Sequence, residues 1–206
     1  MTFKAKGAEE LSQATRRAPG GAGAHAASSV YDDSSIHALA RRAVETFISQ
    51  GRVIEQALAP EASMLSRPAA CFVCIKTLGR ELRGCIGTFE PEKSTLAEEV
   101  VANAIKAATR DPRFRPLSRA ELPALYYSVD VLGSLEPARF EELDPAIFGV
   151  LVVARQGSRR GLLLPNIESI RTADAQVRVA AEKASIRPDE PLKLYRFRTR
   201  RFSEWD

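Results

Sequence analysis

Apolar side chains recur at three- and four-residue spacing in three segments, which is the pattern of amphipathic helices. The first predicted helix follows Asp32-Asp33-Ser34-Ser35, which are good N-cap residues, and it ends at Gly51. Thr95 and Glu98 are spaced to form a capping box at the start of the second helix. The predicted helices cover about residues 36–50, 95–109 and 172–184.

Other runs are rich in β-branched and aromatic residues, which favours strands. Alternation in the last of these runs changes parity near Tyr195, which predicts a bulge within one continuous strand. Residues 136–147 have no regular pattern and are predicted to be irregular. The predicted strands cover residues 70–78, 81–87, 125–132, 149–155, 161–164 and 192–202.

The first two strands are separated by Gly79-Arg80, which is a strong hairpin signal. If these two residues form the whole loop, Lys76 faces Arg83 across the hairpin. Cys74 then faces Cys85, with Cβ atoms about 5 Å apart. Two cations side by side repel each other unless an anion or an acidic side chain lies between them. This register therefore hints at a ligand site for an anion.

The returning strand carries the hexapeptide Leu82-Arg83-Gly84-Cys85-Ile86-Gly87. Glycine lets the backbone approach a ligand closely, and an arginine offers a planar fork of donors to a carboxylate or phosphate. Cys85 is a potential nucleophile if its thiolate is stabilised. The alternative is that Gly84 and Gly87 mark a bulge or a close strand contact and that Cys85 is a small buried residue. From these six residues alone, the packing alternative is favoured.

Two further segments supply candidate site residues. The loop Asp111-Pro112-Arg113-Phe114-Arg115-Pro116-Leu117 contains two prolines, which fix its backbone and present the side chains between them at low entropy cost. Asn103 lies near the edge of the small-residue face of the second helix. It is either a buried hydrogen-bonding residue or a solvated one.

The composition is that of an ordinary globular protein. The chain has 206 residues, of which 45% are hydrophobic and 27% charged, and a net charge of +4. That charge permits an anionic partner without demanding one. Residues 1–30 form a Gly- and Ala-rich basic segment that we expect to be a disordered tail, with the folded domain over residues 31–206.

Three cysteines, an odd number without framework spacing, predict a reduced, cytoplasmic protein. Cys71 and Cys74 have the spacing of a redox or zinc pair, but on a strand their side chains point to opposite faces. We therefore expect no metal site there. No apolar run is long enough for a membrane helix, the N-terminal segment has no apolar core that would make it a secretory signal, and no cofactor motif is present.

The last strand is strongly basic, with five cations between Lys193 and Arg201. Such a stretch could follow a phosphate backbone, which raises the possibility of RNA binding. The alternative is the charged face of an edge strand, where cations prevent pairing with other chains. The alternative is favoured because few aromatic residues are available to stack on bases.

In these motifs and their order, the sequence resembles the AMMECR family, whose members are component A of the AmmeMemoRadiSam system. The resemblance covers about residues 34–202. It depends on segments 82–87, 103–105, 111–114, 161–165, 183–186 and 195–197. Within them, Ser185 stands where the family more usually has Gly. Cys74, outside them, stands where Ser or Thr is more common.

The resemblance implies an α+β fold of two subdomains, with a mostly antiparallel or mixed sheet, flanking helices and a cleft between the lobes. It also implies a radical SAM protein and a Memo-type protein as partners, but no established activity. We expect a cleft around the hexapeptide that binds a small anionic ligand. The expected ligand-binding residues are Arg83, Gly84, Gly87, Asn103, Asp111, Arg113 and Phe114, with Cys85 as the candidate catalytic residue.

Two other functions remain open. One is an enzyme with Cys85 as nucleophile and Arg83 as anion clamp. No histidine is well placed to serve as its base, because His37 is the only one in the folded region. The other is RNA binding through the basic C-terminal strand, which ranks last.

Overall fold

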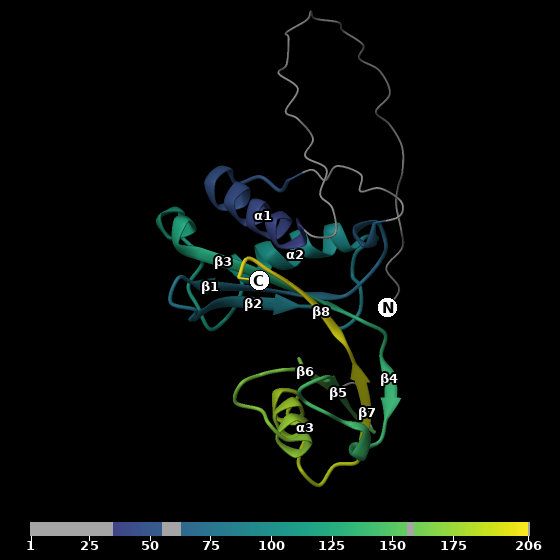
Figure 1. Ribbon diagram of the computed structural model, residues 1–206. Helices are drawn as coiled ribbons and strands as arrows, with labels where there is room; N and C mark the ends of the chain where they lie inside the picture. The colour runs from purple at the N-terminus through teal and green to yellow at the C-terminus, as the bar shows by residue number, and fades with distance from the viewer. Residues whose placement is uncertain (1–34, 55–62, 156–158, 206) are drawn as a thin grey trace, which may run out of the picture.

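The computed structural model describes residues 35–54, 63–155 and 159–205, so the predicted tail lies outside the described residues. Figure 1 shows two lobes, each built from a sheet and the helices that pack on it. Both sheets have four strands, and every strand pair is antiparallel. The predicted α+β class is confirmed.

In the first lobe, two helices cover one face of the sheet β2-β1-β3-β8. The side chains of β1 alternate, and Cys71, Val73 and Ile75 are fully buried against the helices. Their neighbours point to the opposite, open face. The elements of this lobe are α1 (Ile36–Gln50), η2 (Met64–Ser66), β1 (Cys71–Thr77), β2 (Leu82–Gly87), α2 (Leu96–Thr109), η3 (Arg119–Ala124), β3 (Leu125–Leu132) and β8 (Thr199–Ser203).

The helix ends follow the sequence signals. Gly51 takes a left-handed conformation, and its N–H bonds to the Phe47 carbonyl to close α1. At the start of α2 the Thr95 hydroxyl accepts from the Glu98 N–H, and the Glu98 carboxylate accepts from the Thr95 N–H. The predicted capping box is confirmed.

The second lobe is smaller, with one helix packed on the sheet β4-β7-β5-β6. Its helix approaches β6 closely because Gly161 has no side chain: a Cβ there would lie 1.8 Å from the Ala180 carbonyl oxygen. The elements are β4 (Glu136–Ala138), η4 (Phe140–Glu142), β5 (Gly149–Ala154), β6 (Arg160–Leu163), α3 (Ala173–Lys183) and β7 (Leu192–Phe197). Residues 136–147 are therefore more regular than predicted, since the short β4 and η4 carry too few residues to show a period.

The basic C-terminal segment is not one strand, and that prediction was wrong. β7 belongs to the second sheet and β8 to the first, with the change near Arg198 (Figure 1). The parity change near Tyr195 lies within β7, whose pairing with β5 is regular. Leu192 and Leu194 pack against the core of the second lobe, whereas Tyr195 and Phe197 on the other face pack in the cluster between the two sheets. Two apolar faces on one strand therefore produce the same sequence signal as a bulge.

The lobes meet through an apolar cluster between the two sheets. Phe197, Leu151 and Leu162 of the second sheet pack with Leu132 and Ala70 of the first lobe. The open face of the first sheet is thus covered at one end. In the part of the chain that the structure describes, no helix is both long and apolar enough to span a bilayer.

Candidate functional site

The hairpin between β1 and β2 has a three-residue loop rather than the expected two. The Thr77 carbonyl accepts from the Arg80 N–H at 2.9 Å, and the Thr77 N–H donates to the Glu81 carbonyl at 2.9 Å. Arg80 adopts a left-handed conformation with φ of 66°.

The longer loop changes the register near the turn. Lys76 lies opposite Leu82, and the shift beside Ile75 leaves Arg83 as the extra, bulged residue. The predicted pairing of Lys76 with Arg83 was therefore wrong. Beyond the bulge the predicted register holds, and Cys74 lies opposite Cys85.

Cys74 and Cys85 form a disulfide, with Cα atoms 4.1 Å apart. Residues directly opposite in a non-hydrogen-bonded antiparallel pair approach most closely, which places the two sulfurs together. The expectation that the cysteines are reduced was wrong for this pair. Cys71 is a free thiol on the helix-covered face, where burial raises its pKa to about 12. It cannot act together with Cys74, as the strand alternation predicted.

Cys85 is held from outside the sheet by the loop after α2. β2 is an edge strand, so the outward N–H and C=O of Cys85 have no neighbouring strand. The Asp111 carboxylate accepts the Cys85 N–H at 2.8 Å, and Arg113 Nη2 donates to the Cys85 carbonyl at 3.3 Å. Asp111 also binds the Arg113 guanidinium at 2.7 and 2.9 Å. We call Asp111 and Arg113 the brace of the hairpin.

Charge explains why the brace is stable. The Asp111 side chain is 2% exposed, yet the Arg113 guanidinium and the Cys85 N–H lower its pKa to about 2. Arg83 has a similar partner: its Nε donates to Glu121 at 2.7 Å, which lowers the pKa of that carboxyl to about 2. The charges of Arg113 and Arg83 are thus each paired with a carboxylate.

The structure brings five of the predicted site residues into one cluster. Phe114 lies near both guanidinium groups, with its ring centre 5.8 Å from the Arg83 Cζ and 5.5 Å from the Arg113 Cζ. With Asp111 and Cys85, these residues form a single contact network on β2 and the adjacent loop. Their contacts to each other hold the hairpin in place.

The other three predicted residues lie in packed positions. A Cβ on Gly84 would lie 2.3 Å from the Ala107 carbonyl oxygen, and one on Gly87 would lie 2.3 Å from the Phe72 ring. Asn103 is fully buried and donates to the Cys71 carbonyl at 3.1 Å and to Glu99 at 3.3 Å. Close packing accounts for the two glycines and internal hydrogen bonds account for Asn103, so none of the three positions requires a ligand.

A pocket of about 180 Å³ opens on the exposed face of the first sheet, beside the disulfide. Cross-strand pairing places Cys74, Ser128 and Ser203 in one row across β1, β3 and β8. The pocket is lined by Cys74, Lys76, Arg80, Ser128, Arg201, Ser203 and Trp205, all from the first lobe. Arg83, Cys85 and Arg113 are not among these residues.

The pocket is strongly basic. Among the described residues, Lys76 and Arg80 form no ion pair. Lys76 Nζ instead lies 5.2 Å from the centre of the Trp205 ring. Arg201 binds the buried Asp130 through two bonds of 2.8 and 3.0 Å. In the described part of the chain, three cations of the pocket therefore face one carboxylate, and the uncompensated charge lies on Lys76 and Arg80.

Sequence reasoning named Lys76 as a cation near the hairpin but missed Arg201, Ser128 and Ser203. A signal was present in β3, where Tyr126, Ser128 and Asp130 alternate with buried apolar residues. No pattern in the sequence shows that β8 pairs with β3, and without that pairing Arg201 has no place beside Lys76.

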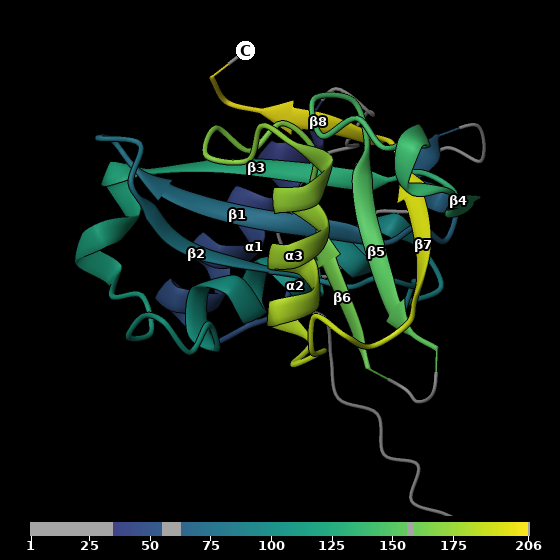
Figure 2. The same ribbon diagram turned by 90° about the horizontal axis from the view of Figure 1, so that it is seen from below.

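The second lobe contributes one cation near the brace. Burial, followed by the nearby charge of Arg113, lowers the pKa of Lys183 at the end of α3. Figure 2 shows α3 in front of the first sheet in the view from below.

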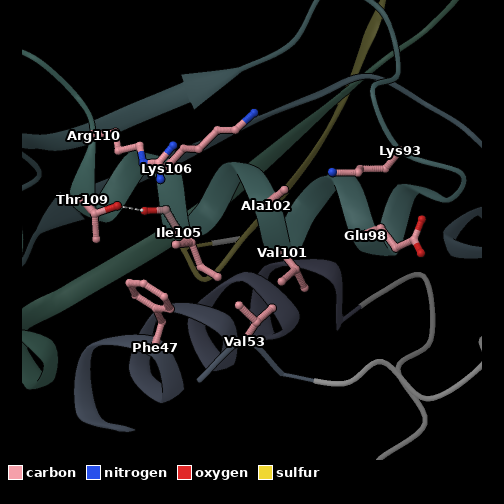
Figure 3. Close-up of a pocket in the computed structure, with 10 residues that line it drawn as sticks. All are labelled: Phe47, Val53, Lys93, Glu98, Val101, Ala102, Ile105, Lys106, Thr109 and Arg110. Carbon is pink, nitrogen blue, oxygen red and sulfur yellow. Dashed lines mark hydrogen bonds between the residues drawn. The ribbon is translucent and has the colours of Figure 1, made fainter. Parts of the chain in front are cut away.

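A larger hollow, of about 470 Å³, lies between α1 and α2 on the other side of the lobe (Figure 3). Phe47, Val53, Val101 and Ile105 form its apolar floor, and Lys106 at its edge pairs with Glu92 at 3.0 Å. The described residues of its lining include no thiol, no histidine and no buried carboxylate.

Together these features define a two-lobed α+β protein with a basic pocket and a disulfide on the open face of one sheet. The chain belongs to the AMMECR1 family, whose profile matches residues 37–202.

A Thermotoga maritima protein is 44% identical over 163 residues, covering 78% of this chain and 92% of the relative. A Clostridium acetobutylicum protein is 40% identical over 169 residues, but the match covers only 35% of that relative and 81% of this chain. The crystal structure of the uncharacterized protein PH0010 from Pyrococcus horikoshii is similar, with a TM-score of 0.74 and 29% identity. That match covers 85% of this chain and 93% of the other.

Proposed function

We propose that this protein binds a small anionic ligand in the pocket beside the hairpin of residues 71–87. The observation that carries the proposal is the lining of that pocket, where Lys76 and Arg80 have no ion-pair partner among the described residues. Cations gathered in a concave site repel one another and raise the local concentration of anions. An anion in the pocket removes this repulsion.

The pocket also selects for size and shape. A volume of about 180 Å³ is smaller than the ~300–1,000 Å³ typical of sites for drug-sized molecules, so the ligand is small. Arg80 offers a planar fork for a carboxylate or phosphate, and Lys76 offers a point charge. Ser128 lies on the floor of the pocket, and its hydroxyl can donate a hydrogen bond to the same anionic group.

Trp205, the only tryptophan of the chain, provides the assay because its ring lines the pocket and contacts Lys76. Titration with inorganic phosphate and with succinate, monitored by tryptophan fluorescence at low salt, should give a saturable change. Lys76→Gln should weaken the apparent affinity about tenfold, and the exposed Arg178→Gln on α3 should leave it unchanged. A change that does not saturate, or that is identical in Lys76→Gln, would refute the proposal.

We also propose that the protein acts beside a radical SAM protein and a Memo-type protein. Membership of the AMMECR1 family supports this proposal, through the association that the resemblance implies. Co-expression of the three proteins from one genome, followed by affinity capture and native mass spectrometry, tests it. Absence of any complex at micromolar concentrations, with and without S-adenosylmethionine, would argue against direct association.

The two alternatives differ in their support. Cys85 as a nucleophile requires that the Cys74–Cys85 disulfide first be reduced. For RNA binding, the basic segment is divided between two sheets, and Arg196 and Arg198 both stack on Phe148. Such a division favours the small-ligand pocket over a continuous track for a phosphate backbone.

A further inference from the structure

We propose that the Cys74–Cys85 disulfide is a reversible thiol–disulfide exchange site whose substrates are small thiols that carry a carboxylate or phosphate. This activity rests on the proposed anion pocket, because the same cations would guide the thiol to the disulfide. Two observations combine here: the disulfide itself and its position in the wall of a basic pocket.

Access favours attack on Cys74. Both cysteines are partly exposed, but only Cys74 lines the pocket; Cys85 lies on the edge strand, where the brace binds its backbone N–H and carbonyl. A thiolate bound with its anionic group near Lys76 and Arg80 has its sulfur on the side of Cys74. Cys85 is then the leaving group, and Arg83 precedes it by two residues on the same strand.

The exchange runs in two balanced steps. In the first, a substrate thiolate attacks Cys74 Sγ, the Cys74–Cys85 bond breaks with its electron pair on Cys85, and Cys74 is left in a mixed disulfide. In the second, another substrate thiolate attacks the substrate-derived sulfur of the mixed disulfide, which releases a small-molecule disulfide and the Cys74 thiolate. Two thiols are oxidised, the protein disulfide is reduced by two electrons, and the cysteine thiolates take up the protons released by the substrates.

The scaffold favours the reverse reaction as well. The strand pairing of β1 with β2 and the bonds from Asp111 and Arg113 to Cys85 do not depend on the sulfur–sulfur bond. The reduced cysteines therefore remain opposite each other, so closure of the disulfide is an intramolecular step with a high effective concentration. A small anionic disulfide would accept the two electrons and regenerate the oxidised protein.

The first experiment uses the full chain, purified without reductant, and three thiols of different charge. Peptide mapping establishes the Cys74–Cys85 link. The protein is then treated with 3-mercaptopropionate, 2-mercaptoethanol or cysteamine, trapped by alkylation, and analysed by mass spectrometry. Per unit of thiolate, the anionic thiol should react about tenfold or more faster than cationic cysteamine. That ratio should shrink in 0.5 M salt, because salt screens the attraction.

Variants assign the selectivity to the pocket. Arg80→Gln and Lys76→Gln should each slow the reaction with 3-mercaptopropionate about three- to tenfold and leave that with 2-mercaptoethanol nearly unchanged. The matched control is Arg178→Gln, whose exposed side chain lies on α3 and pairs with Glu182. Both pocket variants affect exposed or half-buried side chains, so folding should be retained.

Each outcome is decisive. Absence of the disulfide after equilibration with an oxidised anionic thiol, or resistance of the folded protein to millimolar thiols, would overturn the exchange site. Equal rates for the three thiols would overturn the substrate class. If phosphate still binds near Trp205 in either case, the anion pocket stands and only the exchange activity fails.

Discussion

Replacing Asp111 by Asn tests whether the brace holds the hairpin through charge. The side chain of Asp111 is 2% exposed, and its carboxylate accepts from the Cys85 N–H and from the Arg113 guanidinium. The fall of its pKa from 3.8 to about 2 corresponds to about 2 kcal/mol at neutral pH, at ~1.36 kcal/mol per unit. An asparagine keeps the shape but loses that charge, so we expect a loss of about 2–3 kcal/mol in unfolding free energy.

The pH dependence separates this cause from general damage. Because the folded-state pKa lies below the unfolded one, the stabilisation is complete well above pH 4 and is lost as the pH falls through about 2. The stability gap between wild type and Asp111→Asn should therefore be about 1 kcal/mol smaller at pH 3 than at pH 6.

Urea unfolding at both pH values measures the gap. The control is Glu182→Gln, which removes an exposed helix ion pair with Arg178 and should cost less than about 0.5 kcal/mol. An Asp111→Asn variant within about 0.5 kcal/mol of wild type, or a gap that does not change between the two pH values, would show that the brace does not act through its charge.

Three further predictions concern the interior around the hairpin. Gly84→Ala places a Cβ 2.3 Å from the Ala107 carbonyl oxygen and should lower the unfolding free energy, measured in urea, by about 1–3 kcal/mol. The control is Gly79→Ala, whose Cβ meets only the Thr77 hydroxyl at 3.7 Å. Equal effects of the two variants would contradict the packing. Cys71, with its pKa raised to about 12 by burial, should resist iodoacetamide at pH 8 in the folded protein and react in urea; rapid labelling without urea would show that the thiol is accessible. Asn103→Leu removes one of the donors to the Cys71 carbonyl and to Glu99 and should destabilise by about 1–3 kcal/mol in thermal unfolding; a neutral variant would contradict this expectation.

Local signals in the sequence determined much of the first lobe. Gly51 ended α1, Thr95 and Glu98 fixed the start of α2, and apolar periodicity gave β3 its observed bounds. These features depend on contacts between residues a few positions apart, so the spacing in the sequence determines which residues meet. The predicted opposition of Cys74 and Cys85 holds because the bulge at Arg83 offsets the extra residue in the loop.

The hairpin also shows where local reasoning fails. Leu78 joins the loop, which closes with a left-handed Arg80 and shifts the register of Lys76, and the bulge at Arg83 then restores the predicted register. Gly79-Arg80 in the sequence is compatible with loops of two or three residues. The choice between them depends on how the strands pair beyond the turn.

Tertiary structure alone decided the composition of the site. The sequence supplied Arg83, Cys85, Asp111 and Arg113 as candidates, but only the fold shows that the last two bind the backbone of Cys85. The pocket needs Arg201 on β8, which lies beside β3 because the chain leaves the second lobe after β7 and returns to the first. Pairing between strands some 70 residues apart is a property of two packed cores, and no local pattern of hydrophobic and polar residues encodes it.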